Sequence, residues 1–225
     1  AAAAFAPTAV DSLRPTIRTL AQHLIDTAPH EPLDAIGQFA QPLSLGVTLH
    51  LLGIETPDAP RIHQLANLLI ITTQFGLQPG HTAAATAAAR DDFAHLIETL
   101  EVRESSLLAS LRSARDAGRL TTDDLHSLVI FIATVGQAPT VFALGNALLA
   151  LLRNPDQLTA LRDEPALLPN LLDESARFAP PLRVIRCFAA IATQFEGQTI
   201  RAGDQLQLII PATNRDPAVF PNPNH

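Results

Sequence analysis

The chain has 225 residues, enough for one large domain or two small ones. Hydrophobic residues make up 47%, charged residues make up 16%, and the mean hydropathy is +0.19, a composition that excludes intrinsic disorder. The net charge of -7 and the pI near 5.5 argue against a nucleic-acid-binding protein, because nothing concentrates positive charge against phosphate. The single cysteine excludes a disulfide framework and a cysteine-rich metal site.

Several residue types are missing altogether. The chain contains no Met, Trp or Tyr, and all 15 of its basic residues are arginine. Together with 18 prolines and abundant Ala and Leu, this composition is typical of a GC-rich bacterial gene. The start at residues 1–4 is a run of alanines without the basic stretch of a signal peptide, so we expect a cytoplasmic protein.

The first half of the chain has the apolar spacing of helices. In chain order, helices are predicted over residues 8–26, 32–52, 61–75 and 82–117. Gly53 is placed to end the second helix, and the segment from Gly76 to Gly80 breaks the third. The polar run of residues 121–124 is expected to cap the next helix.

That next helix, residues 128–152, is almost continuously apolar and long enough to span a membrane. It contains Gln137, Pro139 and Asn146, which are unfavourable in lipid, and charged segments flank it, so we interpret it as a buried central helix. Pro139 removes one backbone donor, and a kink or local unwinding is therefore expected there.

Beyond this helix the period of the pattern changes. Helices are predicted over residues 155–163 and 165–178, and short strands over 184–188, 191–195, 199–200 and 205–210. Gly197-Gln198 and Ala202-Gly203-Asp204 are the expected hairpin turns. The predicted fold is mostly α with a small β element, and residues 1–225 are expected to form a single domain.

Four segments resemble one family. Residues 147–158 (ALLALLRNPDQL), 174–178 (ESARF), 212–220 (ATNRDPAVF) and 4–10 (AFAPTAV) resemble, in the same order, segments of the bacterial cytochrome P450 family. The resemblance implies a partial cytochrome P450-like fold with a long, kinked central helix, the I helix of that family. As given, the chain begins after the position of the H-x-x-x-R segment of the family and ends before its cysteine-ligand loop.

The central helix departs from the family pattern. The resemblance places the oxygen-activation motif A-G-x-[DE]-T on residues 135–139, so Ala138 stands at the acid position and Pro139 at the alcohol position. Neither side chain can hold or relay a proton. Gly136 remains and could leave a groove beside a ligand. The resulting pocket-lining candidates are Gly136, Gln137, Ala138, Pro139, Thr140 and Arg186.

Other matched positions are interpreted as architectural. Glu174 and Arg177 stand at the E-x-x-R motif of the family and can pair with each other and with a loop residue such as Arg215. Arg186 stands where a propionate-binding arginine is usual, and without haem it could bind an acidic residue or another anionic ligand. Cys187 is not where the family places an iron ligand, and we interpret it as a small buried side chain.

No further motif indicates an active site. His23, His30, His63, His81 and His95 are interpreted as helix-surface or loop residues, and no metal site is predicted. The catalytic residues, if any exist, are unknown from the sequence.

Three functions stay open. The first is a haem-free P450-like protein of bacterial secondary metabolism that activates a partner enzyme such as a deoxysugar glycosyltransferase, as the resemblance implies. The second is a non-oxidative cyclase or isomerase that takes an apolar small molecule into the emptied haem pocket. The third is a fragment of a haem-thiolate monooxygenase whose cysteine loop lies outside the given chain. As given, no cofactor, nucleic-acid partner or membrane is expected.

Overall fold

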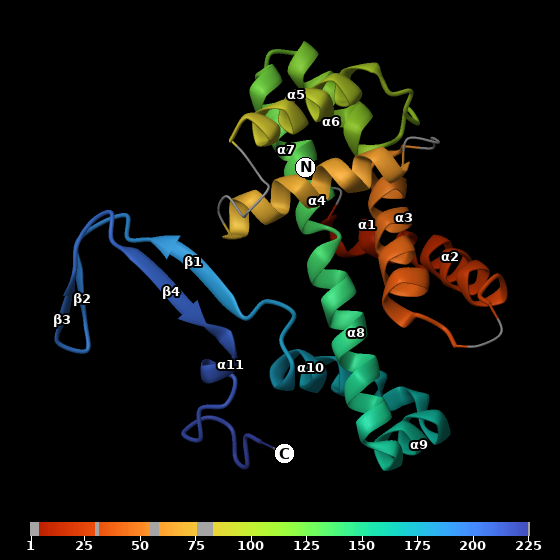
Figure 1. Cartoon of the computed structure of the whole chain (residues 1–225), viewed down its shortest axis with the longest axis vertical. Helices are drawn as coiled ribbons and strands as arrows, with labels where there is room; N and C mark the ends of the chain where they lie inside the picture. Colours follow the sequence, from red (N-terminus) through yellow and green to blue (C-terminus); the bar gives the residue numbers. More distant parts are fainter. Residues whose placement is uncertain (1–4, 30–31, 55–58, 76–82, 225) are drawn as a thin grey trace. The chain divides into compact units, whose positions relative to one another are not determined.

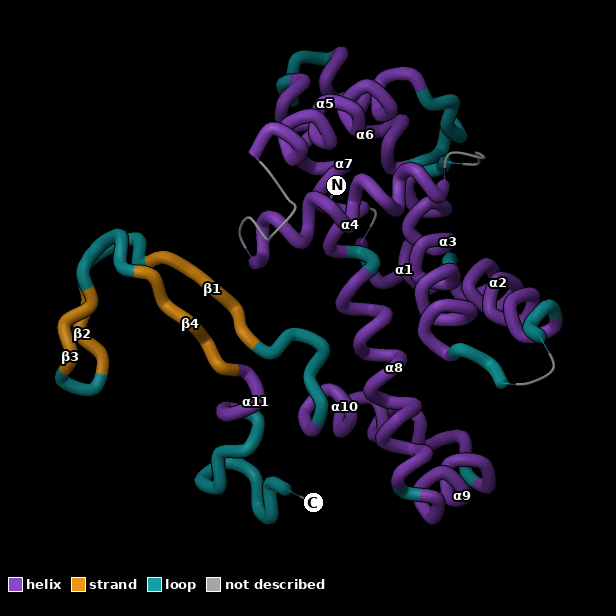
Figure 2. Tube along the Cα trace, viewed as in Figure 1, coloured by secondary structure: helices purple, strands orange, loops and turns teal. Residues whose placement is uncertain are grey.

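The computed structural model describes residues 5–29, 32–54, 59–75 and 83–224, which form two compact units, Ala1–Val141 and Phe142–His225. The first unit is helical and the second combines helices with two small sheets (Figure 1; Figure 2). This agrees with the predicted fold class, whereas the expectation of a single domain stays a prediction. The expected break at residues 76–80 lies outside the described residues.

Helices make up the first unit. They are α1 (Pro7–Ser12), α2 (Arg14–Asp26), the π-helix η2 (Ala35–Ala40), α3 (Gln41–Leu52), α4 (Ala59–Phe75), α5 (Ala83–Thr99), α6 (Leu107–Asp116), α7 (Thr122–Val135) and the first residues of α8 (Ala138–Arg153). One apolar core joins α3 to α7, and its largest fully buried side chains are Phe93, Leu52, Ile62, Ile97, Leu108, Leu125 and Val129. Burial of these side chains is the main stabilising term of the unit.

Local capping divides one helix that the apolar pattern had joined. A single helix over residues 82–117 was expected, but α5 ends at Thr99 and α6 begins at Leu107. The Ser106 hydroxyl accepts a hydrogen bond from the Ala109 amide at 3.1 Å and so starts α6. Arg112 donates to the carbonyl oxygens of Ile97 and Leu100, which closes the end of α5.

The central apolar helix is interrupted as predicted. α7 ends at Val135, Gly136 and Gln137 form a turn, and α8 begins at Ala138, so that Pro139 lies in a first turn that needs no amide donor. Thr121 and Asp124 form a reciprocal capping box at the start of α7. We call residues 136–140 the α7–α8 joint.

The prediction that this helix is buried holds for α7 better than for α8. In α7, Leu125, Val129, Ile132 and Ala133 are buried, whereas in α8 only Val141 falls in that class among the described residues. The segment Thr122–Arg153 is long and apolar enough to cross a membrane, but core helices of soluble proteins meet the same criterion. Taken alone, its length and composition are weak evidence for a span.

The second unit continues α8 and then adds short elements. These are α9 (Pro155–Asp163), the 3-10 helix η3 (Pro165–Leu167), α10 (Leu168–Phe178), β1 (Val184–Phe188), β2 (Thr193–Phe195), β3 (Gln198–Ile200), β4 (Gln205–Ile209) and α11 (Ile210–Thr213). β1 pairs with β4, and β2 pairs with β3, both antiparallel (Figure 2). The expected hairpin across Ala202-Gly203-Asp204 was wrong, because β4 pairs with β1 and not with β3.

The β2–β3 hairpin turns one residue earlier than expected. Glu196 and Gly197 both have positive φ, 49° and 76°, which suits a two-residue turn whose twist matches the flanking strands. The glycine adopts this conformation without the steric cost that a side chain adds.

Candidate functional site

The α7–α8 joint is held from α3 by a hydroxyl group. Ser44 Oγ lies 3.2 Å from the carbonyl oxygens of both Gly136 and Gln137 and donates to them. The Thr140 hydroxyl also donates to the Gly136 carbonyl, at 3.3 Å. The Gln137 carbonyl also accepts from the Val141 amide at 3.1 Å, so Ser44 adds a second donor there, and the hydroxyls of Ser44 and Thr140 both donate to the Gly136 carbonyl.

Gly136 is a close-packing position. A Cβ atom at Gly136 would lie 2.6 Å from the Ile132 carbonyl oxygen and 3.1 Å from Thr48 Oγ1. The sequence suggested that this glycine leaves a groove for a ligand. The structure gives it a second role, because a side chain here would crowd the backbone of α7 and the Thr48 hydroxyl of α3.

Gln137 is buried, with 4% of its surface exposed, and its side chain makes two contacts. Gln137 Nε2 donates to the Ala133 carbonyl at 2.6 Å, and Oε1 lies 2.8 Å from His63 Nδ1 of α4. His63 Nε2 in turn lies 2.9 Å from Asn67 Nδ2. His63 had been interpreted as a surface or loop residue, and nothing in the local sequence pattern pointed to this partnership across 74 positions.

The remaining residues of the joint carry little chemistry. Ala138 and Pro139 are half-buried and Thr140 is exposed. Just before the joint, Phe131 and Val135 of α7 are 59% and 41% exposed. They are four residues apart and therefore share one helix face. Exposed apolar side chains, Phe131 and Val135, thus lie next to the joint, and residues 135–140 include no acidic side chain.

Glu174 and Arg177 of α10 form the predicted ion pair. Arg177 Nη2 and Nε lie 2.5 and 2.8 Å from the two Glu174 oxygens, and this guanidinium holds the pKa of the Glu174 carboxyl below its usual range. Arg177 Nη1 also donates to the carbonyls of Asn214 and Pro223, both at 3.0 Å. The pair therefore ties α10 to the C-terminal loop.

Arg215 takes a different partner from the one suggested by the sequence. Arg215 Nη2 donates to the Phe178 carbonyl at 2.6 Å, and its guanidinium lies 4.9 Å from the centre of the Phe178 ring. It thus caps the end of α10 and adds a cation–π contact. No hydrogen bond or ion pair links it to Glu174 in the part of the chain that the structure describes.

Arg186 and Cys187 lie side by side in sequence on β1. Arg186 is exposed and pairs in register with Gln207, whereas Cys187 is half-buried, is not in a disulfide and pairs with Leu206. Residues 5–29, 32–54, 59–75 and 83–224 contain no group of three or more His, Cys, Asp or Glu side chains that could hold a metal ion.

A cavity of about 500 Å³ lies within the second unit, between α8, α9 and α10. Its lining includes Leu151, Leu161, Glu174 and Phe178, and none of the six predicted pocket residues contributes to it. The cavity therefore does not correspond to the pocket predicted from the sequence.

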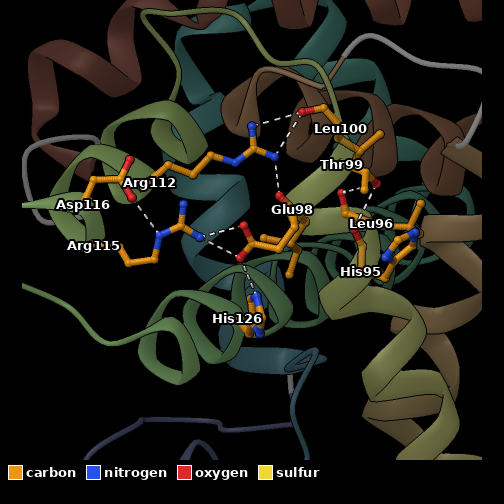
Figure 3. A network of polar contacts seen from close by, with 10 residues as sticks. His95, Leu96, Glu98, Thr99, Leu100, Arg112, Arg115, Asp116 and His126 are labelled. Atoms are coloured by element: carbon orange, nitrogen blue, oxygen red, sulfur yellow. Dashed lines mark hydrogen bonds and ion pairs between the residues drawn. The ribbon is translucent and has the colours of Figure 1, made fainter.

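A polar network that the sequence did not predict joins α5, α6 and α7 (Figure 3). Arg115 Nη1 lies 2.7 and 2.6 Å from the two oxygens of Glu98, and His126 Nε2 lies 2.7 Å from Oε1. Burial alone would raise the pKa of Glu98, but the hydrogen bonds from Arg115 and His126 outweigh it and lower the pKa. Every oxygen of this carboxylate is engaged, so the network serves helix packing.

Comparison with known proteins identifies the family. The family model for Cytochrome P450 matches residues 94–225, more than half of the chain. The chain belongs to the cytochrome P450 family. It is 31% identical to the biotin biosynthesis cytochrome P450 of Bacillus subtilis (strain 168), over 100% of this chain and 58% of the relative. It is 33% identical to cytochrome P450 107B1 of Saccharopolyspora erythraea, over 98% and 55%.

Solved P450 structures share the fold. The structure of P450BioI in complex with hexadec-9Z-enoic acid ligated acyl carrier protein aligns with a TM-score of 0.88 and 30% identity, over 99% of this chain and 59% of that one. CalO2 aligns with a TM-score of 0.89 and 27% identity, over 99% and 57%. This P450 chain thus spans somewhat more than half the length of the relatives it matches.

P450 enzymes hold haem iron through a cysteine thiolate. Cys187 does not fit that role, because it lies in the middle of a paired strand, and the described residues offer no other group of metal-ligating side chains. At the joint, Ala138 and Pro139 likewise offer no proton donor or acceptor. Within the described ranges, Cys187 and the side chains of Ala138 and Pro139 thus differ from the thiolate ligand and the proton relay that P450 enzymes use.

Proposed function

We propose that this chain is part of a haem-free P450-like protein of bacterial secondary metabolism that acts as an accessory partner, or activator, of a biosynthetic enzyme such as a deoxysugar glycosyltransferase. The proposal is carried by the α7–α8 joint, where alanine and proline occupy residues 138 and 139, the positions at which the resemblance places the acid and the alcohol of the family. A protein that does not split dioxygen is free to lose these groups and keep the fold.

The neighbouring polar groups support this interpretation, because each has another partner. Gln137 Nε2 donates to the Ala133 carbonyl, and Gln137 Oε1 lies within hydrogen-bond distance of His63 Nδ1. The Thr140 hydroxyl donates to the Gly136 carbonyl. A general acid needs a titratable proton that it can deliver to the reacting atom. An amide and a helix-bonded hydroxyl beside alanine and proline do not provide one at neutral pH.

Two findings favour a role that involves a partner. P450BioI, a relative in structure, was solved in complex with a ligated acyl carrier protein, and another, PksS, is named for the bacillaene polyketide synthase of Bacillus subtilis. In the chain itself, Phe131 and Val135 present an exposed apolar face, which suits an apolar small molecule or an apolar partner segment. We place the protein in the cytoplasm, without a nucleic-acid partner, in keeping with its net charge of -7.

The partner role is tested by adding the purified protein to a deoxysugar glycosyltransferase from the same biosynthetic cluster and measuring sugar transfer. We expect transferase turnover or thermal stability to rise in proportion to the added protein. A Phe131→Ser variant should weaken the effect, whereas Arg14→Ser, at an exposed position on α2, should not. Absence of binding and of activation would refute the proposed role.

A second candidate is a haem-thiolate monooxygenase of which this chain is a part. It is favoured by the collinear similarity to P450 relatives and by the intact Glu174–Arg177 pair. In that case the double variant Ala138→Glu/Pro139→Thr should raise the yield of oxidised product with a reductase and dioxygen. For the haem-free protein, the same variant should leave the yield at the level of the buffer blank.

A further inference from the structure

The α7–α8 joint is contacted by α4 through a chain of three polar side chains, Gln137, His63 and Asn67. These three side chains share no residue with the Glu98 network. Gln137 is buried and His63 and Asn67 are half-buried, so the contacts are largely shielded from water. A row of hydrogen-bonded side chains that is shielded from water lowers stability unless each polar group has a partner. The positions of donors and acceptors along the row are therefore constrained.

The geometry determines which ring nitrogen of His63 carries the proton. Gln137 Nε2 faces the Ala133 carbonyl, which only accepts, so the NH₂ group of the amide must point there. Gln137 Oε1 therefore faces His63 Nδ1 and accepts from it. Nδ1 of His63 therefore carries a proton, and Nε2 lies 2.9 Å from Asn67 Nδ2, a donor one helical turn further along α4.

Each contact acts on the same short stretch of backbone. Gln137 occupies the turn between α7 and α8, and its side-chain amide satisfies a carbonyl in the last turn of α7. Ser44 of α3 donates to the Gly136 and Gln137 carbonyls at the same turn. The α7–α8 joint is thus held from α3 by the Ser44 hydroxyl and from α4 by the His63 imidazole.

We propose that Gln137, His63 and Asn67 form a brace that fixes the α7–α8 joint against α4, with Gln137 as the positioning residue that selects the Nδ1–H tautomer of His63. The brace keeps the helix interrupted at Gly136–Gln137 without any bound ligand. This inference does not depend on the proposed function, because it concerns the conformation of the joint and not its chemistry.

Nitrogen-15 NMR of the ligand-free protein, labelled at histidine, tests the tautomer directly. We expect the His63 ring to show the Nδ1–H pattern, and Gln137→Leu to shift it towards the Nε2–H form that predominates in water. The control Gln64→Leu changes an exposed glutamine on the same helix and should leave the pattern unchanged. An Nε2–H form of His63 in the unaltered protein would overturn the proposal.

Amide hydrogen exchange of the same proteins tests the brace. Loss of Gln137 Oε1 leaves the half-buried Nδ1–H donor of His63 without its acceptor, and we expect exchange at Gly136 and Val141 to rise about tenfold in Gln137→Leu. The double variant Gln137→Leu/His63→Leu should recover part of the protection, since it removes both polar partners together. Exchange in Gln137→Leu that equals that of Gln64→Leu, or protection that appears only after an apolar ligand is added, would overturn the brace.

Discussion

Substitution of Gly136 by alanine probes the packing of the α7–α8 joint. The new methyl group would lie 2.6 Å from the Ile132 carbonyl oxygen and 3.1 Å from Thr48 Oγ1, so backbone and side chain must both shift. Overpacking of this kind costs about 1–3 kcal/mol, and the reduced freedom of the unfolded chain offsets about 0.4–1 kcal/mol. We expect Gly136→Ala to destabilise the protein by about 1–2 kcal/mol, which lowers Tm by roughly 2–8 °C for a chain of this size.

The matched control is Gly46→Ala, within α3. There a Cβ atom would meet Leu20 Cδ1 at 3.4 Å, which is ordinary contact, and alanine improves helix propensity by about 1 kcal/mol. Urea unfolding followed by circular dichroism should show Gly136→Ala less stable, and Gly46→Ala equal to or more stable than the original protein. The reasoning is refuted if Gly136→Ala proves as stable as Gly46→Ala.

Three further substitutions follow from contacts in the structure. Glu98→Gln should destabilise the protein by about 1 kcal/mol at neutral pH, a value reduced for the partial exposure of the pair. Because folding lowers the pKa of Glu98, this difference is present above the unfolded pKa of the carboxyl and should vanish as the pH falls through the folded one, as urea unfolding at several pH values would show. Thr121→Ala removes the capping box of α7 and should cost about 1 kcal/mol in thermal unfolding, unlike Thr122→Ala. Arg177→Lys keeps the charge but loses the fork that binds Glu174, and should lower Tm more than Arg183→Lys.

Each of these has an outcome that contradicts it. A Glu98→Gln difference that persists unchanged in acid would show that the ion pair is not its source. Equal loss for the two threonine variants would place the effect outside the cap. If Arg177→Lys and Arg183→Lys behave alike, the hydrogen-bond geometry at α10 does not matter.

Sequence patterns predicted the helices and strands better than they predicted where one helix ends and the next begins, or which strands pair. Pro139 and the polar run at 121–124 indicated both ends of α7, because proline and capping residues act within one turn of the chain. The split between α5 and α6 was missed, since Arg112 closes α5 from 12 and 15 residues away. The pairing of β4 with β1 was also missed, because a strand pattern does not name its partner.

Contacts in the candidate site could be predicted only where both partners lie close together in the sequence. Glu174 and Arg177 are three residues apart on one helix, so their pairing could be read from the spacing. The partners of Gln137 and Glu98 come from other helices, at separations of 74, 17 and 28 residues, and no local pattern encodes them. Arg215 was expected to join the Glu174–Arg177 pair but donates to the Phe178 carbonyl, because a guanidinium can donate to backbone carbonyls as well as to carboxylates.

An absorbance spectrum of the purified protein decides whether this P450 chain belongs to a protein that works without haem, as we propose. The protein, produced with ample haem precursor, is reduced and exposed to carbon monoxide. We expect no Soret band above the protein baseline and no change on adding carbon monoxide. A strong Soret band that shifts to the position characteristic of a thiolate-ligated haem–carbon monoxide complex would contradict it.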